Sequence, residues 1–470
     1  MSESELLGLA VAEQAARIAH GETTSEELVG AYLERIGERE PAVLAWQFLD
    51  RGHALAQARA ADEQRREGKG VGPLHGVPVG IKDIIDTADM PTENGCAAHK
   101  GRQPAADAAC VTALRRAGAV IMGKTVTTEL AAFTPGKTRN PHNPEHTPGG
   151  SSSGSAAAVA AGMVPAALGT QTVGSVIRPA AFCGVVGFKP TFGTIPRTGV
   201  MTQAHSLDTV GVYGRSVEDV ALLVDVLQGH DAGDPASFAS SSPRLLATAT
   251  EDWPLDPIFA FVKTHAWSQT DAATREAFGE LVEELGGQVT EISLDATTER
   301  AYAANRLVQK VEMAAQFGSL LERSPQLLSD GIKVQLEEGR RIPGVDYIAA
   351  LHARDALYAS VEDVLLHYGT ILTPAALGVA PKGLGSTGNP IFCGAWTYLG
   401  VPAVCLPILE VDGMPMGVQL IGARRDDGRL LRTANWLVRM VQRAGAGRTR
   451  TTAAAGRRSG ARRAGKKKAS

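Results

Sequence analysis

The stretch TPGGSSSGSAAAVAAGMVPAALGTQTVGSVIRPAAFCGVVGFKPT, residues 147–191, sets the organisation of this chain. It begins as a Gly/Ser-rich loop, continues into a helix of small residues around Ala156–Ala161, and returns through a second Gly/Thr/Ser turn. Glycine carries no Cβ, so such loops let the backbone approach a ligand or another element closely. Because the two polar turns flank one helix, the pattern allows Ser151 and Ser175 to meet at one site.

Two common catalytic loops are absent from this stretch. The phosphate-binding pattern GxxxxGK[ST] needs a lysine that does not follow Gly154 at the required spacing. The GxSxG pattern of α/β-hydrolases is absent as well. No local pattern ties a histidine to either serine turn, and loop histidines such as His75, His142, His146 and His205 are most often surface residues. A serine-rich site remains, for which lysine is an accepted alternative base.

Three segments of the chain resemble the amidase signature family. They are the stretch above, PLHGVPVGIKDIID at residues 73–86, and the block from Gly388 to Arg424 that begins GNPIFCGAW. The resemblance runs from the first helix to Trp436. It implies one α/β domain of three layers, α/β/α, built around a large twisted mixed β-sheet. Strands that alternate with helices along the chain favour the same class.

The resemblance also assigns catalytic roles to residues of this chain. Lys82, in VGIKDII, matches the general base of the family, and burial can keep part of a lysine neutral near working pH. Ser151 matches the serine that relays the proton and that follows a cis peptide bond. Ser175, in TQTVGSVIR, matches the nucleophile that forms the acyl-enzyme. The oxyanion hole would consist of the backbone N–H groups of Thr172, Val173, Gly174 and Ser175.

Val173 departs from the family pattern, which has glycine most often at this position and alanine next. If the position required a positive φ, a β-branched residue would be strained there. We interpret Val173 as narrowing the acyl pocket rather than inactivating the enzyme. Gln171 replaces a common aspartate, as in members that resemble malonamidase.

Arg178 follows the candidate nucleophile by three residues, in SVIRP. It resembles the arginine that binds a substrate carboxylate in malonamidase-type members. A guanidinium group presents a planar fork of donors that suits this task. The alternative is an internal brace of the turn, and the sequence leaves both roles open.

Composition restricts the compartment and the chemistry. The five cysteines are scattered and lack CxxC spacing, which indicates unpaired thiols in a reducing compartment. The first residues, MSESELLGLA, lack the charged and apolar regions of a signal peptide. No apolar run reaches the ~18 residues that a membrane span needs. We therefore expect a cytoplasmic protein without a membrane segment. No histidine or cysteine cluster indicates a metal, and we expect no cofactor.

The C-terminal segment, residues 443–470, differs from the rest of the chain. It holds ten Lys/Arg residues and no acidic residue, in a low-complexity run of Gly, Ala, Arg and Lys. Such a composition cannot form a packed core. We expect residues 1–442 to form the domain and the tail to be a disordered appendage, with binding of nucleic acid or another polyanion as the open alternative.

Periodicity and capping patterns predict the elements outside this stretch. Asp412–Gly413 predicts a hairpin turn between the last two strands, and the proline-rich loop 134–150 is expected to line the mouth of the site. Helices are expected at residues 6–20, 25–38, 50–67, 109–117, 216–227 and 271–285 and over most of 303–366. Strands are expected at residues 46–49, 77–81, 119–122, 259–262, 370–373, 404–409 and 418–421.

The leading functional hypothesis is an amidase that hydrolyses a small-molecule carboxamide to a carboxylate and ammonia or an amine. One alternative is the glutaminase subunit of a tRNA-dependent amidotransferase, although TQTVGSVIR differs from the DTGGSIR pattern of such subunits. Another is a non-catalytic protein derived from an amidase. The sequence leaves open whether the acyl group is carboxylated, aromatic or aliphatic, and whether the protein forms a homodimer.

Overall fold

A computed structural model describes residues 2–238 and 244–444 of the chain. Its centre is a mixed sheet of 11 strands in the order β1-β3-β2-β4-β6-β5-β10-β11-β9-β7-β8. The strands are β1 (Trp46–Phe48), β2 (Pro78–Lys82), β3 (Val120–Thr125), β4 (Ala166–Gln171), β5 (Val186–Lys189), β6 (Thr209–Gly214), β7 (Phe259–Phe261), β8 (Val289–Glu291), β9 (Thr370–Pro374), β10 (Ala403–Val411) and β11 (Met414–Ile421).

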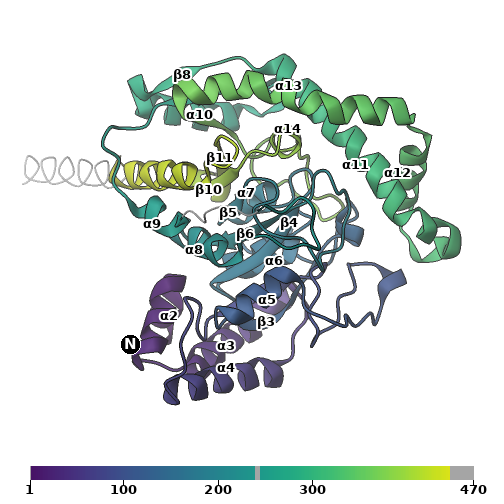
Figure 1. Cartoon of the computed structure of the whole chain (residues 1–470). Coiled ribbons are helices and arrows are strands. Elements are labelled where there is room, and N and C mark those ends of the chain that lie inside the picture. The colour runs from purple at the N-terminus through teal and green to yellow at the C-terminus, as the bar shows by residue number, and fades with distance from the viewer. Residues whose placement is uncertain (1, 239–243, 445–470) are drawn as a thin grey trace, which may run out of the picture.

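Helices cover the sheet and complete the expected α/β architecture of three layers (Figure 1). The helices are α1 (Glu3–Gly8), α2 (Val11–His20), α3 (Ser25–Val43), α4 (Arg51–Arg66), η1 (Ala97–His99), α5 (Ala109–Arg116), η2 (Glu129–Ala131), α6 (Ser153–Ala160), α7 (Ile177–Cys183), α8 (Val217–Leu227), α9 (Leu245–Thr250), η3 (Trp267–Gln269), α10 (Ala272–Leu285), η4 (Gly286–Gln288), α11 (Asp295–Arg323), η5 (Pro325–Leu327), α12 (Asp330–Arg341), α13 (Gly344–Tyr368) and α14 (Gly394–Tyr398). A further helix covers residues 427–444.

The layers divide by their contacts with the sheet. Helices α6 and α7 contact each other, with α6 on β2, β3 and β4 and α7 on β5, β10 and β11. Helices α5 and α8 also contact each other and pack on β3, β5 and β6. The long helices α11, α12 and α13 lie at the far side of the molecule from the N-terminal helices (Figure 1). Among the described residues, no helix has the length and apolarity to cross a membrane.

Several local predictions are confirmed. Thr24 Oγ1 accepts the Glu27 N–H at 3.1 Å, and the Glu27 carboxylate accepts the Thr24 N–H at 2.9 Å, which completes the capping box of α3. The predicted hairpin joins β10 and β11. Asp412 and Gly413 have φ values of 51° and 74°, and this left-handed pair matches the right-handed twist of the strands.

The prediction of one helix over residues 6–20 is wrong. The chain is extended at Leu9 and Ala10, which separates α1 from α2. The Arg215 guanidinium donates to two carbonyl oxygens of this segment, one of them from Leu9. Asp219 Oδ1 accepts the Val11 N–H at 2.8 Å. Groups more than 200 residues away therefore stabilise the break, which local periodicity does not show.

Strand β4 is another element that local pattern missed. Its sequence, AALGTQ, has none of the β-branched or aromatic residues that favour strands except Thr170. All of its residues are buried between β2 and β6. The alanines and Gly169 leave room there for Tyr213, whose ring lies 2.7 Å from the place where a Cβ on Gly169 would stand. Burial in the centre of the sheet thus outweighs weak strand propensity.

The parallel pair β2 and β4 positions the site. Ile81 stands opposite Leu168, so the strand ends that carry Lys82 and Thr170 lie at one edge of the sheet. Helix α6 begins beside them, and its small residues let it approach closely. Within α6 the backbone approaches its neighbours closely at Gly154, because a Cβ there would lie 2.3 Å from the Ala45 carbonyl oxygen.

We predict that Gly154→Ala destabilises the protein by about 1–3 kcal/mol, because the added methyl group overlaps backbone that cannot move freely. Gly279→Ala is the matched control. Gly279 lies in α10 with no atom near its missing Cβ, so alanine there should stabilise the helix by up to ~1 kcal/mol. Calorimetric Tm values measure both. Equal changes in the two variants would contradict the close approach of α6.

Candidate active site

Lys82 and Ser151 form the centre of the site. Lys82 Nζ donates to Ser151 Oγ at 2.7 Å and to Thr170 Oγ1 at 2.7 Å. Lys82 has no exposed surface, and Ser151 is 2% exposed. The bond between Gly150 and Ser151 is a cis peptide, as the resemblance implied. The structure thus brings two of the predicted residues together and adds Thr170, which was not predicted.

Burial changes the protonation of Lys82. It lowers the pKa of the ammonium group to about 7, and the negative charge of Asp208 opposes this shift. No carboxylate is hydrogen-bonded to Lys82 in the part of the chain that the structure describes. Both of its partners are hydroxyl groups, which stabilise a charge less than a carboxylate does. Lys82 is therefore able to exchange a proton with Ser151 near neutral pH.

Asp208 links this lysine to the second serine turn. Its side chain is buried, and Oδ1 accepts the Thr172 hydroxyl at 2.6 Å. Oδ2 accepts the backbone N–H groups of Gln203 and Ala204 at 2.7 and 2.9 Å. Burial raises the pKa of Asp208, and these three donors oppose the shift. Asp208 therefore fixes Thr172 while its charge acts on Lys82.

Side chains from other segments hold the turn that carries Ser175 by donating hydrogen bonds to its backbone carbonyl groups. Asn305 Nδ2 donates to the Thr172 carbonyl oxygen at 3.1 Å. Thr397 Oγ1 donates to the Val173 carbonyl oxygen at 2.8 Å. In a planar trans peptide the C=O group and the next N–H group point in opposite directions. The N–H groups of Val173 and Gly174 therefore point away from the two bracing side chains, as donors of an oxyanion hole would.

The residues on either side of the turn are fixed as well. Gln171 Oε1 accepts the N–H groups of Val176 and Ile177 at 2.8 and 3.0 Å. Tyr213 Oη donates to the Ser175 carbonyl oxygen at 3.1 Å. Ser175 is half-buried, in a segment that is otherwise buried. An accessible hydroxyl on a braced turn is a suitable nucleophile, provided that a base lies in reach.

Val173 causes no backbone strain, because its φ is not positive. Its side chain is 3% exposed, and Cγ1 lies 3.0 Å from the place where a Cβ on Gly394 would stand. The Tyr302 ring approaches the same place to 2.6 Å. Val173 therefore packs between the turn and α14. A strained backbone with a positive φ at this position is excluded. The effect of Val173 on the width of the acyl pocket stays a prediction.

Arg178 joins the two serine turns. Its Nη2 donates to the Gly150 carbonyl oxygen at 2.7 Å, and its Nε donates to the Thr387 carbonyl oxygen at 2.7 Å. This observation supports the role of a brace. The remaining nitrogen, Nη1, is buried without a hydrogen-bond partner among the described residues and lies 3.1 Å from the place of a Cβ on Gly174. Arg178 thus keeps donor capacity beside the nucleophile turn.

Ser155 and three of the four loop histidines have structural partners, His75 is buried rather than at the surface, and His205 is exposed as expected. Ser155 lies inside α6 rather than at its cap, and its Oγ donates to the Leu168 carbonyl oxygen at 2.8 Å. His75, His142 and His146 each contact a backbone carbonyl oxygen through a ring nitrogen. Within residues 2–238 and 244–444, no histidine is hydrogen-bonded to either candidate serine. The geometry therefore favours lysine as the base.

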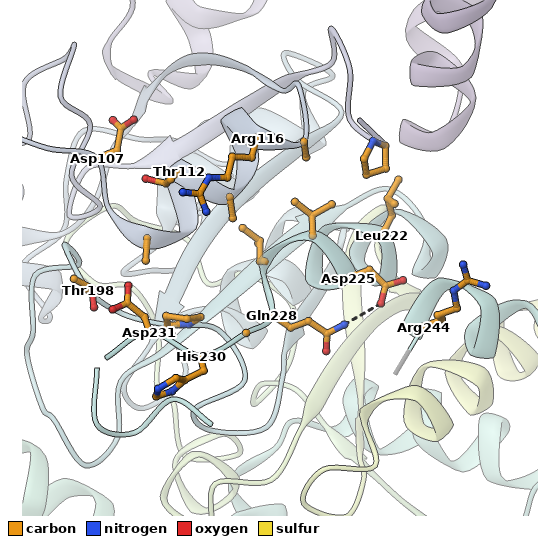
Figure 2. Close-up of a pocket in the computed structure, with 18 residues that line it drawn as sticks. Asp107, Thr112, Arg116, Thr198, Leu222, Asp225, Gln228, His230, Asp231 and Arg244 are labelled. Atoms are coloured by element: carbon orange, nitrogen blue, oxygen red, sulfur yellow. Dashed lines mark hydrogen bonds between the residues drawn. The ribbon is translucent and has the colours of Figure 1, made fainter. Parts of the chain in front are cut away.

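A separate surface cleft contains none of the candidate residues (Figure 2). It has a volume of about 930 Å³ and lies between α5, with Arg116, and the segment after α8, with His230 and Asp231. Its charged groups are of both signs, and among its described lining residues there is no buried nucleophile. The arrangement offers no chemistry comparable to that around Lys82.

Sequence reasoning missed five residues that hold the site: Thr170, Asp208, Tyr213, Asn305 and Thr397. Thr170 and Thr397 lie in segments that resemble the family, but nothing in the pattern marks them as partners of the site, and Asp208, Tyr213 and Asn305 lie outside those segments. Only Asp208 carried a signal, since it is a charged residue directly before an apolar strand.

Comparisons with known proteins identify the family of this chain. The family model described as Amidase matches residues 27–431. A glutamyl-tRNA(Gln) amidotransferase protein of Chloroflexus aurantiacus, the A subunit of that enzyme, is 33% identical over 482 residues, which cover 93% of this chain and 98% of the relative.

The chain is also similar to solved structures over nearly its whole length. The peptide amidase of Stenotrophomonas maltophilia superposes with a TM-score of 0.79 at 29% identity, over 92% of this chain and 97% of that one. A chain of a vestigial protein complex linked to the origins of an s-triazine catabolic enzyme gives a TM-score of 0.86 at 28% identity, over 93% and 99%. The chain belongs to the amidase signature family, whose enzymes hydrolyse amide C–N bonds.

Proposed function

We propose that this protein hydrolyses a small-molecule carboxamide to a carboxylate and ammonia or an amine, through an acyl-enzyme on Ser175. The observation that carries the proposal is the fully buried Lys82, whose ammonium group lies 2.7 Å from Ser151 Oγ. A lysine without a carboxylate partner costs folding free energy unless it is neutral for part of the time. Such a residue in contact with a serine supports the role of a general base.

The reaction follows from the roles of three residues. Neutral Lys82 accepts the proton of Ser151 Oγ as Ser151 accepts the proton of Ser175 Oγ, which attacks the amide carbonyl carbon. The N–H groups of Val173 and Gly174, with those of Thr172 and Ser175, stabilise the negative oxygen. The proton returns through Ser151 to the leaving nitrogen, and the C–N bond breaks. Water then attacks the ester by the same route and releases the carboxylate and Ser175.

Arg178 takes part in substrate binding in this proposal, in addition to bracing the turns. Its unpartnered Nη1 lies beside Gly174, where it can donate to a polar group of a bound substrate. Burial lowers the pKa of Arg178 to about 10, so the guanidinium stays charged at neutral pH.

The free cysteines support a reducing compartment, and we infer a cytoplasmic location from them. All five cysteines are unpaired and buried. The basic tail was predicted for residues 443–470. Residues 443 and 444 end the helix of residues 427–444, and the rest lies outside the described residues, so the disorder of the tail and its polyanion alternative stay predictions, as does a homodimer.

A second candidate is the glutaminase component of a tRNA-dependent amidotransferase. The identity of 33% to the Chloroflexus aurantiacus relative supports it. Such an enzyme would release ammonia from glutamine for use by partner subunits. An amidase that acts alone requires no partner. Glutamine hydrolysis that appears only after partner subunits and charged tRNA are added would favour the second candidate.

We predict that the isolated protein releases ammonia from members of a panel of malonamate, indole-3-acetamide, benzamide and glutamine. Ser175→Ala should lower kcat/KM by at least about 10³-fold, because no acyl-enzyme forms. Ser237→Ala is the control, since Ser237 is a buried serine outside both serine turns and its hydroxyl donates to the Asp234 carbonyl oxygen. Absence of both turnover and labelling of Ser175 by acylating probes would support the non-catalytic alternative.

We predict that kcat/KM rises with pH through about 7 and then levels off. Lys82 must be neutral to accept a proton, and its pKa is about 7 in the folded protein. Lys82→Met should remove this limb and lower activity by about 10²–10⁴-fold. A limb that persists in the Lys82→Met protein would assign the titration to another group.

Asp208→Asn should move the same limb to lower pH, because the charge of Asp208 raises the pKa of Lys82. Asp427→Asn is the matched control. Asp427 is also buried, accepts two hydrogen bonds from Thr191 and interacts with a buried lysine, Lys189, away from the site. Its variant should leave the pH profile in place. A shift of equal size in both variants would rule out a specific effect of Asp208.

A further inference from the structure

The helix α11 lies over the turn that carries the candidate nucleophile. Asn305 holds the Thr172 carbonyl oxygen at 3.1 Å, and one helical turn of α11 therefore sits directly against this segment. The ring of Tyr302, on the same helix, and the side chain of Val173 both lie close to the place where a Cβ on Gly394 would stand. Arg306 follows Asn305 in α11 and is partly buried.

The ring of Phe133 contacts Arg306 and belongs to a segment that is hydrogen-bonded to the Ser151 turn. The Thr128 N–H donates to the Ser151 carbonyl oxygen at 3.3 Å, and the chain continues through η2 to Phe133. The Arg306 guanidinium lies over this ring, 4.6 Å from its centroid. Arg306 and Phe133 thus belong to two segments, each of which contacts one of the serine turns.

A relay of side-chain amides orients Arg306. Gln203 Nε2 donates to the Leu130 carbonyl oxygen at 3.0 Å, and Gln309 Nε2 donates to Gln203 Oε1 at 2.7 Å. This direction leaves Gln309 Oε1 as an acceptor, and Arg306 Nη1 donates to it. A guanidinium stacked on one face and bonded at one nitrogen is held in place before any ligand arrives.

The charge of Arg306 has no acid bound to it in the part of the chain that the structure describes. Within the described residues, Gln309 is its one hydrogen-bond partner, although a guanidinium carries five N–H donors. The carboxylate that acts on it, Glu338, is bonded to Lys310 at 2.9 Å. Burial lowers the pKa of Arg306, and the Tyr302 hydroxyl and Glu338 oppose this shift.

Arg178 adds a second positive charge on the same side. Burial first, and Arg306 to a smaller extent, lower its pKa, and Tyr302 interacts with both guanidinium groups. A buried cation and a partly buried one, with no acid bound to either among the described residues, favour an anion that arrives with the substrate. The planar fork of an arginine matches a carboxylate in shape and charge.

We propose that Arg306, stacked on Phe133 and oriented by Gln309, binds a carboxylate of the amide substrate beside Ser175. The substrates are then half-amides of dicarboxylic acids. This inference rests on the proposed amidase function and names its substrate class. Arg306 acts in it as a specificity-determining residue, distinct from the groups that break the C–N bond.

Matched substrate pairs test the proposal. Each pair has one chain length with and without a terminal carboxylate: succinamate with butyramide, and glutaramate with valeramide. The wild-type protein should prefer the carboxylated member in kcat/KM. Arg306→Gln should lower this value for the carboxylated amides by about 10- to 100-fold, mainly through KM, and should change the neutral amides by less than about twofold. Arg300→Gln, at an exposed position of α11, is the matched control and should leave both unchanged.

A binding measurement separates this proposal from the amidase function. Calorimetric titration of the Ser175→Ala protein with glutaramate needs no turnover, and the affinity should fall by a similar factor when Arg306→Gln is added. If the wild-type protein hydrolyses valeramide without preferring glutaramate, or if Arg306→Gln lowers both equally, the carboxylate site is wrong and the amidase function stands. If no amide is hydrolysed but glutaramate still binds through Arg306, the amidase function is wrong and the carboxylate site stands.

Discussion

The burial of one ammonium group organises this molecule. Lys82 has no exposed surface and, among the described residues, only two hydroxyl groups as hydrogen-bond partners. Burial therefore destabilises its charged form and lowers its pKa to about 7. Holding Lys82 in this position requires the parallel register of β2 and β4 and a helix that approaches both strands closely. The small residues of α6 meet that requirement, and Gly154 shows how little space is left. The composition of the central stretch is thus a consequence of the buried lysine.

The turn that carries the candidate nucleophile Ser175 has a second constraint: in the proposed mechanism its N–H groups must stay free. Side chains from three remote segments meet this constraint by donating to the carbonyl groups instead: Asn305 in α11, Thr397 in α14 and Tyr213 in β6. Asp208 accepts the Thr172 hydroxyl of the same turn, and its negative charge raises the pKa of Lys82. A shift of α11 would therefore affect both the proposed oxyanion donors and the residues proposed to bind the substrate. The proposed chemistry and the proposed specificity thus both depend on α11.

The family relationship accounts for the shared core, and α11 carries the features on which the proposed substrate class depends. Relatives at about one third identity keep the family core, which the family model covers from residue 27 to 431. Arg306 obtains its orientation from Gln309 and Gln203 and its stacking partner from Phe133. No motif assigns a substrate-binding role to these positions, so the substrate class has to be inferred from contacts.

The sequence by itself determined the α/β class, the capping box of α3, the β10–β11 hairpin and the three candidate residues Lys82, Ser151 and Ser175. The capping box and the hairpin depend on local patterns, the class on the alternation of strands and helices, and the three candidate residues on segments that resemble the family, so these signals survive without knowledge of the fold. The break between α1 and α2, strand β4, the bracing of the nucleophile turn and the contacts of Arg178 with both serine turns were decided by the tertiary structure. The groups responsible, among them Arg215, Asp208 and Asn305, come from distant segments. Hydrogen bonding and burial act through space, and a linear sequence does not record which distant groups meet.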